Sequence, residues 1–104
     1  MLEQIQNDLD LIKKDILNLI PANAIYLFGS YAKGTATNNS DFDICVISET
    51  QNKRDLTTEL YYNIQVEKPV DILLYTPSEW ENCVEDITSF AHKINKEGVV
   101  LYAR

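Results

Sequence analysis

Apolar residues recur every three or four positions along the first twenty residues of the chain. They form a stripe made of Leu2, Ile5, Leu9, Ile12, Ile16 and Leu19. This spacing predicts an amphipathic helix, which is too short for a coiled coil and is therefore expected to pack on a sheet. Leu11, Leu17 and Ile20 widen the apolar face. Pro21 ends the helix, because the residue before a proline is pushed out of helical geometry.

Short runs of apolar and β-branched residues predict four strands. They lie at residues 24–28, 42–47, 70–75 and 99–102. The first run is continuously apolar and stops at Gly29, as is typical of a buried strand. We expect the last run, which follows Gly98, to be an edge strand.

The segments between these strands predict further helices. We expect a brief helix over residues 30–33 closed by Gly34, then a polar loop over 35–40, and a longer helix over about 54–65. Thr76-Pro77-Ser78-Glu79 is a helix start. Thr76 can cap the first turn, proline suits the first helical position, and Glu79 can return a hydrogen bond.

A further predicted helix carries Ile87, Phe90, Ala91 and Ile94, and Gly98 ends it. The resulting order is one helix followed by strands that alternate with helices. It predicts a single α/β domain over residues 1–104, with helices packed on a sheet. The order leaves open whether that sheet is parallel or mixed.

The charge of the chain restricts its partners. A formal net charge of -7 and a pI near 4.5 oppose direct binding to nucleic acid, where Lys and Arg must neutralise phosphates. A basic protein or a metal-neutralised nucleotide fits this charge better. The sequence has no apolar run of about 18 residues and no basic start of a secretory signal, so we expect a cytoplasmic protein without a membrane segment. Cys45 and Cys83 match no metal spacing and are interpreted as reduced thiols.

Gly29 and Ser30 lie where a buried strand gives way to a helix. Glycine allows a sharp turn and the close approach of a phosphate. The first amides of the following helix carry a partial positive charge, and Ser30 adds a hydroxyl donor, so a phosphate seat is one interpretation. A plain tight turn with a serine cap is the other, because Gly-Ser is common in loops.

Three aspartates point to a cation site. Asp41 and Asp43 are two residues apart on a strand and project to the same face, while Phe42 faces the core. Asp71 lies in a later apolar strand and reaches the same place if the two strands pair. At about 5 Å and an effective dielectric near 20, each pair of carboxylates costs about 3 kcal/mol, a conflict that Mg²⁺ removes. The alternative is three separate solvated acids.

The string Gly29-Ser30, ten intervening residues, then Asp41-Phe42-Asp43 and a later strand aspartate, resembles the signature of the DNA polymerase β-like nucleotidyltransferase superfamily. The longer strings Gly-Ser-Tyr-Ala-Lys-Gly and Asn-Ser-Asp-Phe-Asp-Ile, with the segment over residues 94–102, are similar to its minimal nucleotidyltransferase (MNT) branch. This likeness covers nearly the whole chain. It implies an α+β nucleotidyltransferase fold, in which helices pack on a mixed sheet of about four strands.

The resemblance also implies residue roles. Gly29 and Ser30 would hold the triphosphate of ATP, and Asp41, Asp43 and Asp71 would ligate two Mg²⁺ ions. Asp71 would help to deprotonate an acceptor hydroxyl, which attacks the α-phosphorus with loss of pyrophosphate. Lys33 stands where relatives often have Arg, and we interpret it as a solvated lysine first and as a phosphate contact second.

Proteins of the MNT branch are often encoded beside a HEPN-domain toxin. The leading hypothesis is therefore an antitoxin that transfers AMP from ATP to a toxin tyrosine. The alternatives are an antitoxin that masks its toxin by binding alone, and an adenylyltransferase for a small molecule such as an aminoglycoside. Two other residues carry weaker expectations: Tyr31, beside the phosphate seat, is a candidate nucleotide contact, and His92 is expected to be structural.

Overall fold

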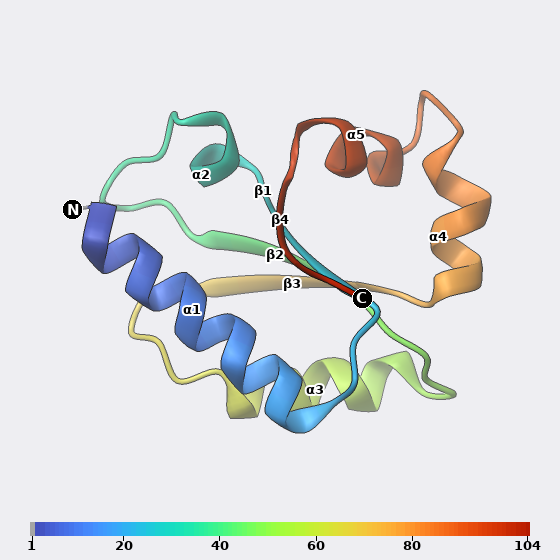
Figure 1. The fold of residues 1–104 in the computed structure, drawn as a ribbon, viewed down its shortest axis with the longest axis horizontal. Coiled ribbons are helices and arrows are strands. Elements are labelled where there is room, and N and C mark those ends of the chain that lie inside the picture. The colour runs from blue at the N-terminus through green and yellow to red at the C-terminus, as the bar shows by residue number, and fades with distance from the viewer. Residues whose placement is uncertain (1) are drawn as a thin grey trace.

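The computed structural model describes residues 2–104, which form one four-stranded sheet with helices on both faces (Figure 1). The helices are α1 (Leu2–Leu19), α2 (Ser30–Lys33), α3 (Lys53–Asn63), α4 (Pro77–Val84) and α5 (Phe90–Glu97). The strands are β1 (Ala24–Phe28), β2 (Phe42–Ile47), β3 (Val70–Tyr75) and β4 (Val99–Ala103). The expected α+β architecture is confirmed.

The sheet is mixed. Its strand order is β3-β2-β1-β4, in which β2 and β3 are parallel and the other two neighbouring pairs are antiparallel. With these directions, β1 ends at the edge of the sheet where β2, β3 and β4 begin. The loops at that edge therefore bring together the three segments that carry Gly29, Asp43 and Asp71.

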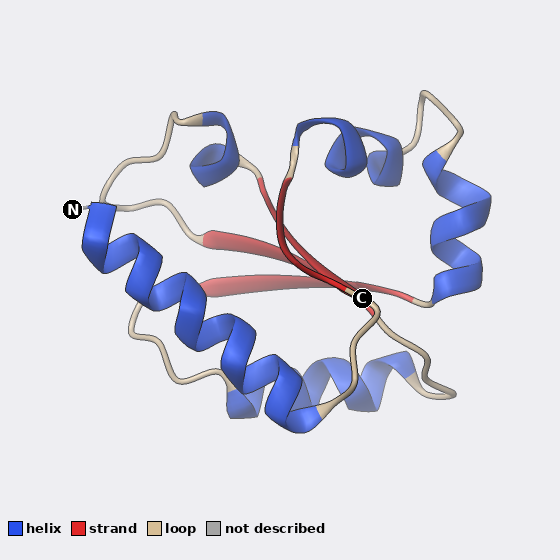
Figure 2. Cartoon of the chain, viewed as in Figure 1, coloured by secondary structure: helices blue, strands red, loops and turns tan. Residues whose placement is uncertain are grey.

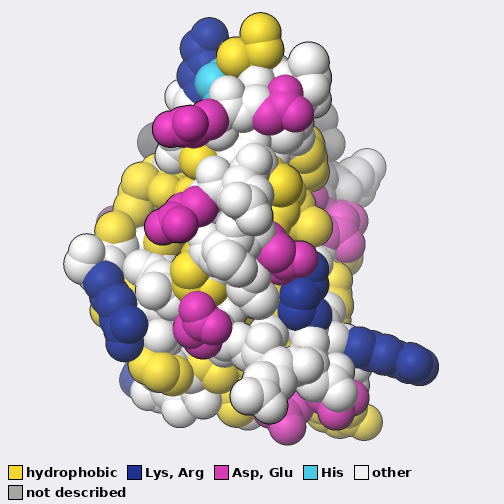
Figure 3. All heavy atoms as spheres, turned by 90° about the vertical axis from the view of Figure 1, so that its right-hand side faces the viewer, with side chains coloured by type: hydrophobic (Ala, Val, Ile, Leu, Met, Phe, Trp, Pro, Cys, Tyr) yellow, Lys and Arg dark blue, Asp and Glu magenta, His cyan; other side chains and the backbone are white. Residues whose placement is uncertain are grey.

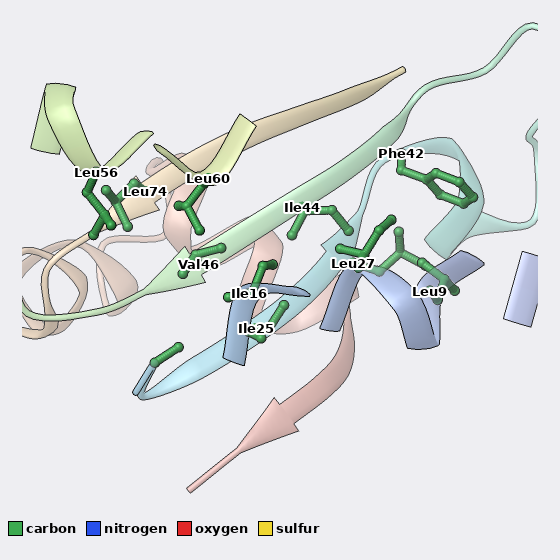
Figure 4. Packing of buried hydrophobic residues seen from close by; sticks show 12 residues of the cluster. Leu9, Ile16, Ile25, Leu27, Phe42, Ile44, Val46, Leu56, Leu60 and Leu74 are labelled. Carbon is green, nitrogen blue, oxygen red and sulfur yellow. The ribbon is translucent and has the colours of Figure 1, made fainter. Parts of the chain in front are cut away.

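One face of the sheet is covered by α1 and α3. The helical stripe is confirmed from Ile5 to Leu19, since Leu9, Ile12 and Ile16 are buried and Ile5 and Leu19 pack against the same core. The three buried residues pack on inward-facing residues of β1 and β2 such as Ile25 and Ile44 (Figure 4). Burial of this apolar area is the main stabilising contribution of α1. The burial of Leu2, the first residue of the predicted stripe, lies outside what the structure describes.

The predicted widening of that stripe is confirmed only in part. Leu17 and Ile20 pack against the core, but the prediction for Leu11 was wrong because its side chain is 47% exposed. Leu11 lies on the helix face that points away from the sheet, where no strand covers it.

The other face of the sheet carries α4 and α5, so the strands lie between two helical layers (Figure 2). Buried Cys45, Ile47 and Ile94 form the centre of this layer. Trp80 of α4 stacks on Tyr26 with a centroid distance of 5.4 Å. This second core fixes α5 beside the end of β1.

The helices begin and end close to the predicted residues, with two corrections to the predicted bounds. The capping box of α4 forms as expected, with Thr76 accepting from the Glu79 amide and Glu79 accepting from the Thr76 amide. Ile87, however, lies outside α5 in the connection to α4 and is 79% exposed. α3 begins at Lys53 after an Asn52 cap and ends at Asn63, a little earlier than predicted.

The surface around α4 carries acidic side chains scattered among apolar and uncharged ones (Figure 3). Its basic side chains do not join into one patch, so this face is not the continuous positive surface that nucleic acid needs. Within residues 2–104, no helix has both the length and the apolar character that crossing a membrane requires.

Candidate functional site

Gly29 is placed at the junction of β1 and α2 by a backbone that only glycine adopts easily. Its φ is 74° and its ψ is -151°, in the positive-φ region that side chains disfavour. A Cβ at this position would overlap Asp43 Oδ2 and would lie 3.0 Å from Asp43 Cγ. The missing side chain of Gly29 thus makes room for the Asp43 carboxylate against the start of α2.

Asp43 and Asp71 are neighbours across the parallel strands. They are register partners in β2 and β3, and Asp43 also opposes Phe28 of β1. Register partners on adjacent strands project to the same face about 5 Å apart. The expected pairing of the two aspartate-bearing strands is therefore present, with Asp43 half-buried and Asp71 exposed.

The charges of these acids act on one another. The pKa of Asp43 lies above its ordinary value, first because burial penalises the charged form and then because of the negative charges of Asp71 and Asp41. Asp41 lies just before β2 and is half-buried. The site is thus a negative region with only oxygen ligands, a chemistry that suits a hard divalent cation.

The three carboxylates do not form a closed ligand set by themselves. Among residues 2–104, no three His, Cys, Asp or Glu side chains come together closely enough to hold a metal ion. This arrangement still fits Mg²⁺, because that ion is commonly held by one or two carboxylates, several waters and the phosphates of a substrate. Asp43 and Asp71 are such a pair of carboxylates, and Asp41 adds a further negative charge close to Asp43.

The start of α2 leaves backbone amides free to meet an anion. Its first backbone hydrogen bond runs from the Lys33 amide to the Gly29 carbonyl at 3.1 Å, so the amides of residues 30–32 precede it. Ser30 follows Gly29 directly as the first residue of α2, and it is half-buried. The turn closes at Gly34 in the left-handed conformation, as expected.

A pocket of about 270 Å³ opens beside Gly29 and Asp43. Its walls come from β1, α2 and α5, and it is lined by Phe28, Gly29, Ala32, Lys33, Asp43, Phe90, Lys93, Ile94 and Glu97. Lys33 Nζ lies 3.9 Å from Glu97 Oε2, which joins α2 to α5 across this pocket. Lys33 is thus both exposed, as expected, and part of the pocket wall.

The α5 side of the pocket was not found from the sequence. The helix was predicted, but its position beside the pocket was not. Asp43 lines the pocket whereas Asp41 and Asp71 do not, and it does so together with Phe90, Lys93 and Glu97. Their spacing of three and four residues places them on one helix face, and this is the single signal that the sequence offered. That the face meets Gly29 depends on the packing of α5 against β1.

The contacts of Tyr31 and His92 bear on two weaker expectations. Tyr31 stacks on Phe42 with a centroid distance of 4.7 Å and does not line the pocket that contains Gly29 and Asp43, so the expected nucleotide contact is not supported. His92 is structural as expected, because its Nδ1 lies 2.9 Å from the Val84 carbonyl oxygen and ties α5 to α4.

Comparisons with known proteins agree with this geometry. The family described as polymerase beta, nucleotidyltransferase matches residues 11–104. A relative from Haemophilus influenzae, a probable protein adenylyltransferase MntA, is 29% identical over 90 residues, which cover 84% of this chain and 75% of the relative.

Two solved structures are similar to the whole fold. One is a crystal structure of a toxin–antitoxin with AMP-PNP. The match has a TM-score of 0.69 and 25% sequence identity, and it covers 92% of this chain and 73% of the matched chain. The other is a mutant of the toxin–antitoxin MntA-HpeT, with a TM-score of 0.64, 25% identity and the same two coverages of 92% and 73%. The sheet and helices described above are therefore those of the nucleotidyltransferase fold.

Proposed function

The chain belongs to the polymerase beta nucleotidyltransferase family, and on this premise we propose that it transfers AMP from ATP to a hydroxyl group of a partner toxin, and so acts as an antitoxin. One observation carries the proposal: the Asp43 carboxylate lies against Gly29 at the start of α2, with Asp71 beside it on β3. The similarity to a protein adenylyltransferase, and to toxin–antitoxin structures of which one holds AMP-PNP, supports the choice of reaction and partner.

Magnesium is the cofactor that this site would take. Asp41, Asp43 and Asp71 would hold it, since they are oxygen ligands in a negative region. When bound, the ion neutralises phosphate charge and aligns the attacking and leaving oxygens, and two ions are expected in displacements of this type.

The residues of the chain would bind the triphosphate and accept the proton of the acceptor. Gly29 and Ser30 would receive the triphosphate, because the amides at the start of α2 are free and Gly29 presents no side chain. Asp71 is the more exposed of the paired acids, so it would accept the proton of an incoming hydroxyl. The hydroxyl oxygen then bonds to the α-phosphorus, the bond from that phosphorus to the β-phosphate oxygen breaks, and pyrophosphate leaves with the electron pair.

We infer that the acceptor is a tyrosine of a HEPN-type toxin, and that the reaction takes place in the cytoplasm. Tyrosine offers a phenolic hydroxyl that is more acidic than those of serine and threonine and is therefore activated more easily by a carboxylate. The net charge of -7 favours a basic protein over a nucleic acid as the surface to be modified.

The test is transfer of label from α-labelled ATP with Mg²⁺ to the purified product of the neighbouring gene. Label should appear on a tyrosine of the partner with the natural chain and should be absent with Asp43→Asn. Asp55→Asn, in an exposed acid of α3 far from the pocket, is the matched control and should retain transfer. A tight complex that neutralises the toxin without any label, and that Asp43→Asn leaves intact, would replace the proposal with masking by binding alone.

A further inference from the structure

One face of α5 forms a wall of the pocket beside Asp43. Phe90, Lys93, Ile94 and Glu97 all line that pocket, and their spacing of three, four and seven residues from Phe90 places them on a single helix face. The wall runs opposite α2, which contributes Ala32 and Lys33. A ligand that enters beside Gly29 therefore meets side chains of α5.

Two apolar contacts fix this wall. Ile94 is only 1% exposed and belongs to the core between α5 and the sheet. Phe90 packs edge-to-face on Phe28 with a centroid distance of 5.4 Å. Lys93 lies on the helix between these two anchors, so its Cα is held in place while its long side chain is exposed and free to reach a ligand.

The two lysines of the pocket differ in their charge partners. Lys33 already faces Glu97 at 3.9 Å. Lys93 makes no ion pair within 4.0 Å among the described residues, where the two ion pairs are Lys33–Glu97 and Lys53–Glu79. A lysine without a carboxylate partner, in a pocket that Lys33 also lines, is suited to an anionic ligand.

We propose that Lys93 binds the β- and γ-phosphates of the nucleotide, the part that leaves as pyrophosphate. This inference rests on the proposed function and adds a contact from α5 to the seat formed by Gly29 and Ser30. Asp41, Asp43 and Asp71 would hold Mg²⁺, and Lys93 would add a cation of the protein itself for the distal phosphates. The lysine ammonium is a compact charge with three donors, which suits a terminal phosphate whose orientation varies.

Comparison of two nucleotides tests the assignment directly, because AMP lacks the distal phosphates and ATP has them. Binding of ATP, AMP and inorganic pyrophosphate is measured by calorimetry with Mg²⁺ and without acceptor, for the natural chain, Lys93→Ala and Lys96→Ala. Lys96 lies on the same helix and does not line the pocket, so it controls for the loss of one positive charge from α5.

We expect Lys93→Ala to weaken the binding of ATP and of pyrophosphate about fivefold or more, while the affinity for AMP changes by less than about twofold. Lys96→Ala should change none of the three. Unchanged ATP binding in Lys93→Ala would overturn the inference and leave the proposed function standing, and so would an equal weakening of ATP and AMP. Failure of the natural chain to bind any of the three ligands would overturn both. Lys93 is exposed, so the fold should persist in both variants, and circular dichroism verifies this.

Discussion

The Asp43 carboxylate occupies the space that a side chain at Gly29 would need, since a Cβ there would overlap Oδ2. Gly29→Ala should therefore displace Asp43 as well as strain a backbone whose φ is 74°. We expect AMP transfer to fall about a hundredfold, as a shift of about 1 Å in a reacting group does. The strain itself should cost about 1–3 kcal/mol of unfolding free energy, because the combination of φ 74° and ψ -151° is populated essentially by glycine alone.

Gly34→Ala is a matched control for that substitution. Gly34 has a similar φ of 78°, but a Cβ there meets no atom within 4 Å. Gly34 is in the left-handed conformation with a ψ of 17°, which alanine tolerates better than the conformation of Gly29, so the control should lose less unfolding free energy in urea, about 1 kcal/mol, and keep its transfer rate. Equal losses of activity in the two variants would show that backbone strain, and not the position of Asp43, sets the effect.

Asp71→Asn should stabilise the metal-free protein and abolish its response to magnesium. The repulsion between Asp43 and Asp71 is much smaller than the value of about 3 kcal/mol expected from the sequence, because Asp71 is exposed and solvent screens its charge. Like charges opposite each other on neighbouring strands then cost about 0.2–1 kcal/mol, and the substitution removes one of the pair. The natural chain should melt at a higher temperature when Mg²⁺ is added, whereas Asp71→Asn should not. Thermal unfolding in EDTA and in Mg²⁺ measures both effects, with Glu67→Gln, an exposed acid before β3, as the control. An unaltered magnesium response in Asp71→Asn would remove this residue from the metal site.

Glu79→Gln should lower stability more at neutral pH than in strong acid. The pKa of Glu79 lies below its ordinary value because its carboxylate accepts from the Thr76 amide and, next, from Lys53 Nζ at 3.1 Å. A lowered pKa means that the charged form stabilises the fold above the ordinary carboxyl pKa, and that this contribution is lost as the pH falls through the folded-state pKa. Gln keeps a capping side chain and removes only the charge, so the difference should be about 0.5 kcal/mol at pH 7, since the pair is exposed.

Urea unfolding at pH 7 and at pH 2.5 measures that difference. The difference should be smaller at the lower pH, because the stabilising charge is lost as the pH falls through the lowered pKa of Glu79 in the folded chain. A difference that is equally large at both pH values would assign the role of Glu79 to packing instead of charge.

The strands were predictable because residues close to them in the sequence mark where they begin and end. Gly29 ends the first apolar run, and the polar loop over residues 35–40 separates it from the second, so the bounds of β1 and β2 matched the prediction. Successive side chains of a strand point to opposite faces of the sheet, and this was equally informative for β2. It predicted that Phe42 enters the core while Asp43 faces the site, and the structure agrees.

The end of α4 and the role of α5 were not predictable in the same way. No Gly or Pro separates the two helices, and the chain turns instead through a hydrogen-bonded bend in which the Thr88 amide donates to Asp86 Oδ1 at 2.9 Å. That bend leaves Ile87 outside the helix. The approach of α5 to Gly29 depends on Ile94 and Phe90 packing on β1, which is a tertiary contact that no local pattern specifies.

Only one of the two cysteines should react in the folded protein. Burial raises the pKa of the Cys45 thiol to about 12, so almost no thiolate is present at pH 8, whereas Cys83 is partly exposed. Because the thiolate is the nucleophile, an aromatic disulfide reagent should titrate one thiol in native buffer and two in guanidinium. Cys83→Ser should leave no fast thiol, and rapid reaction of Cys45 in that variant would show that the second core opens readily.

Glu97→Gln should tighten ATP binding, which is a gain that misfolding cannot produce. In the described structure Lys33 Nζ lies 3.9 Å from Glu97 Oε2, with both side chains nearly half exposed, so Glu97 competes with a phosphate for this lysine. Removing the carboxylate charge frees Lys33 and makes the pocket less negative. An exposed pair contributes about 0.2–1 kcal/mol, which corresponds to an increase of about 1.4- to 5-fold in affinity.

The same calorimetric titration of ATP with Mg²⁺ measures this gain, and Glu81→Gln on α4 controls for the change in net charge. The gain should shrink as salt is raised from 50 to 500 mM, roughly, because screening weakens the competition between exposed charges. Weaker ATP binding in Glu97→Gln would mean instead that the ion pair holds α2 and α5 in the binding geometry, and that Lys33 contacts the nucleotide only while Glu97 positions it.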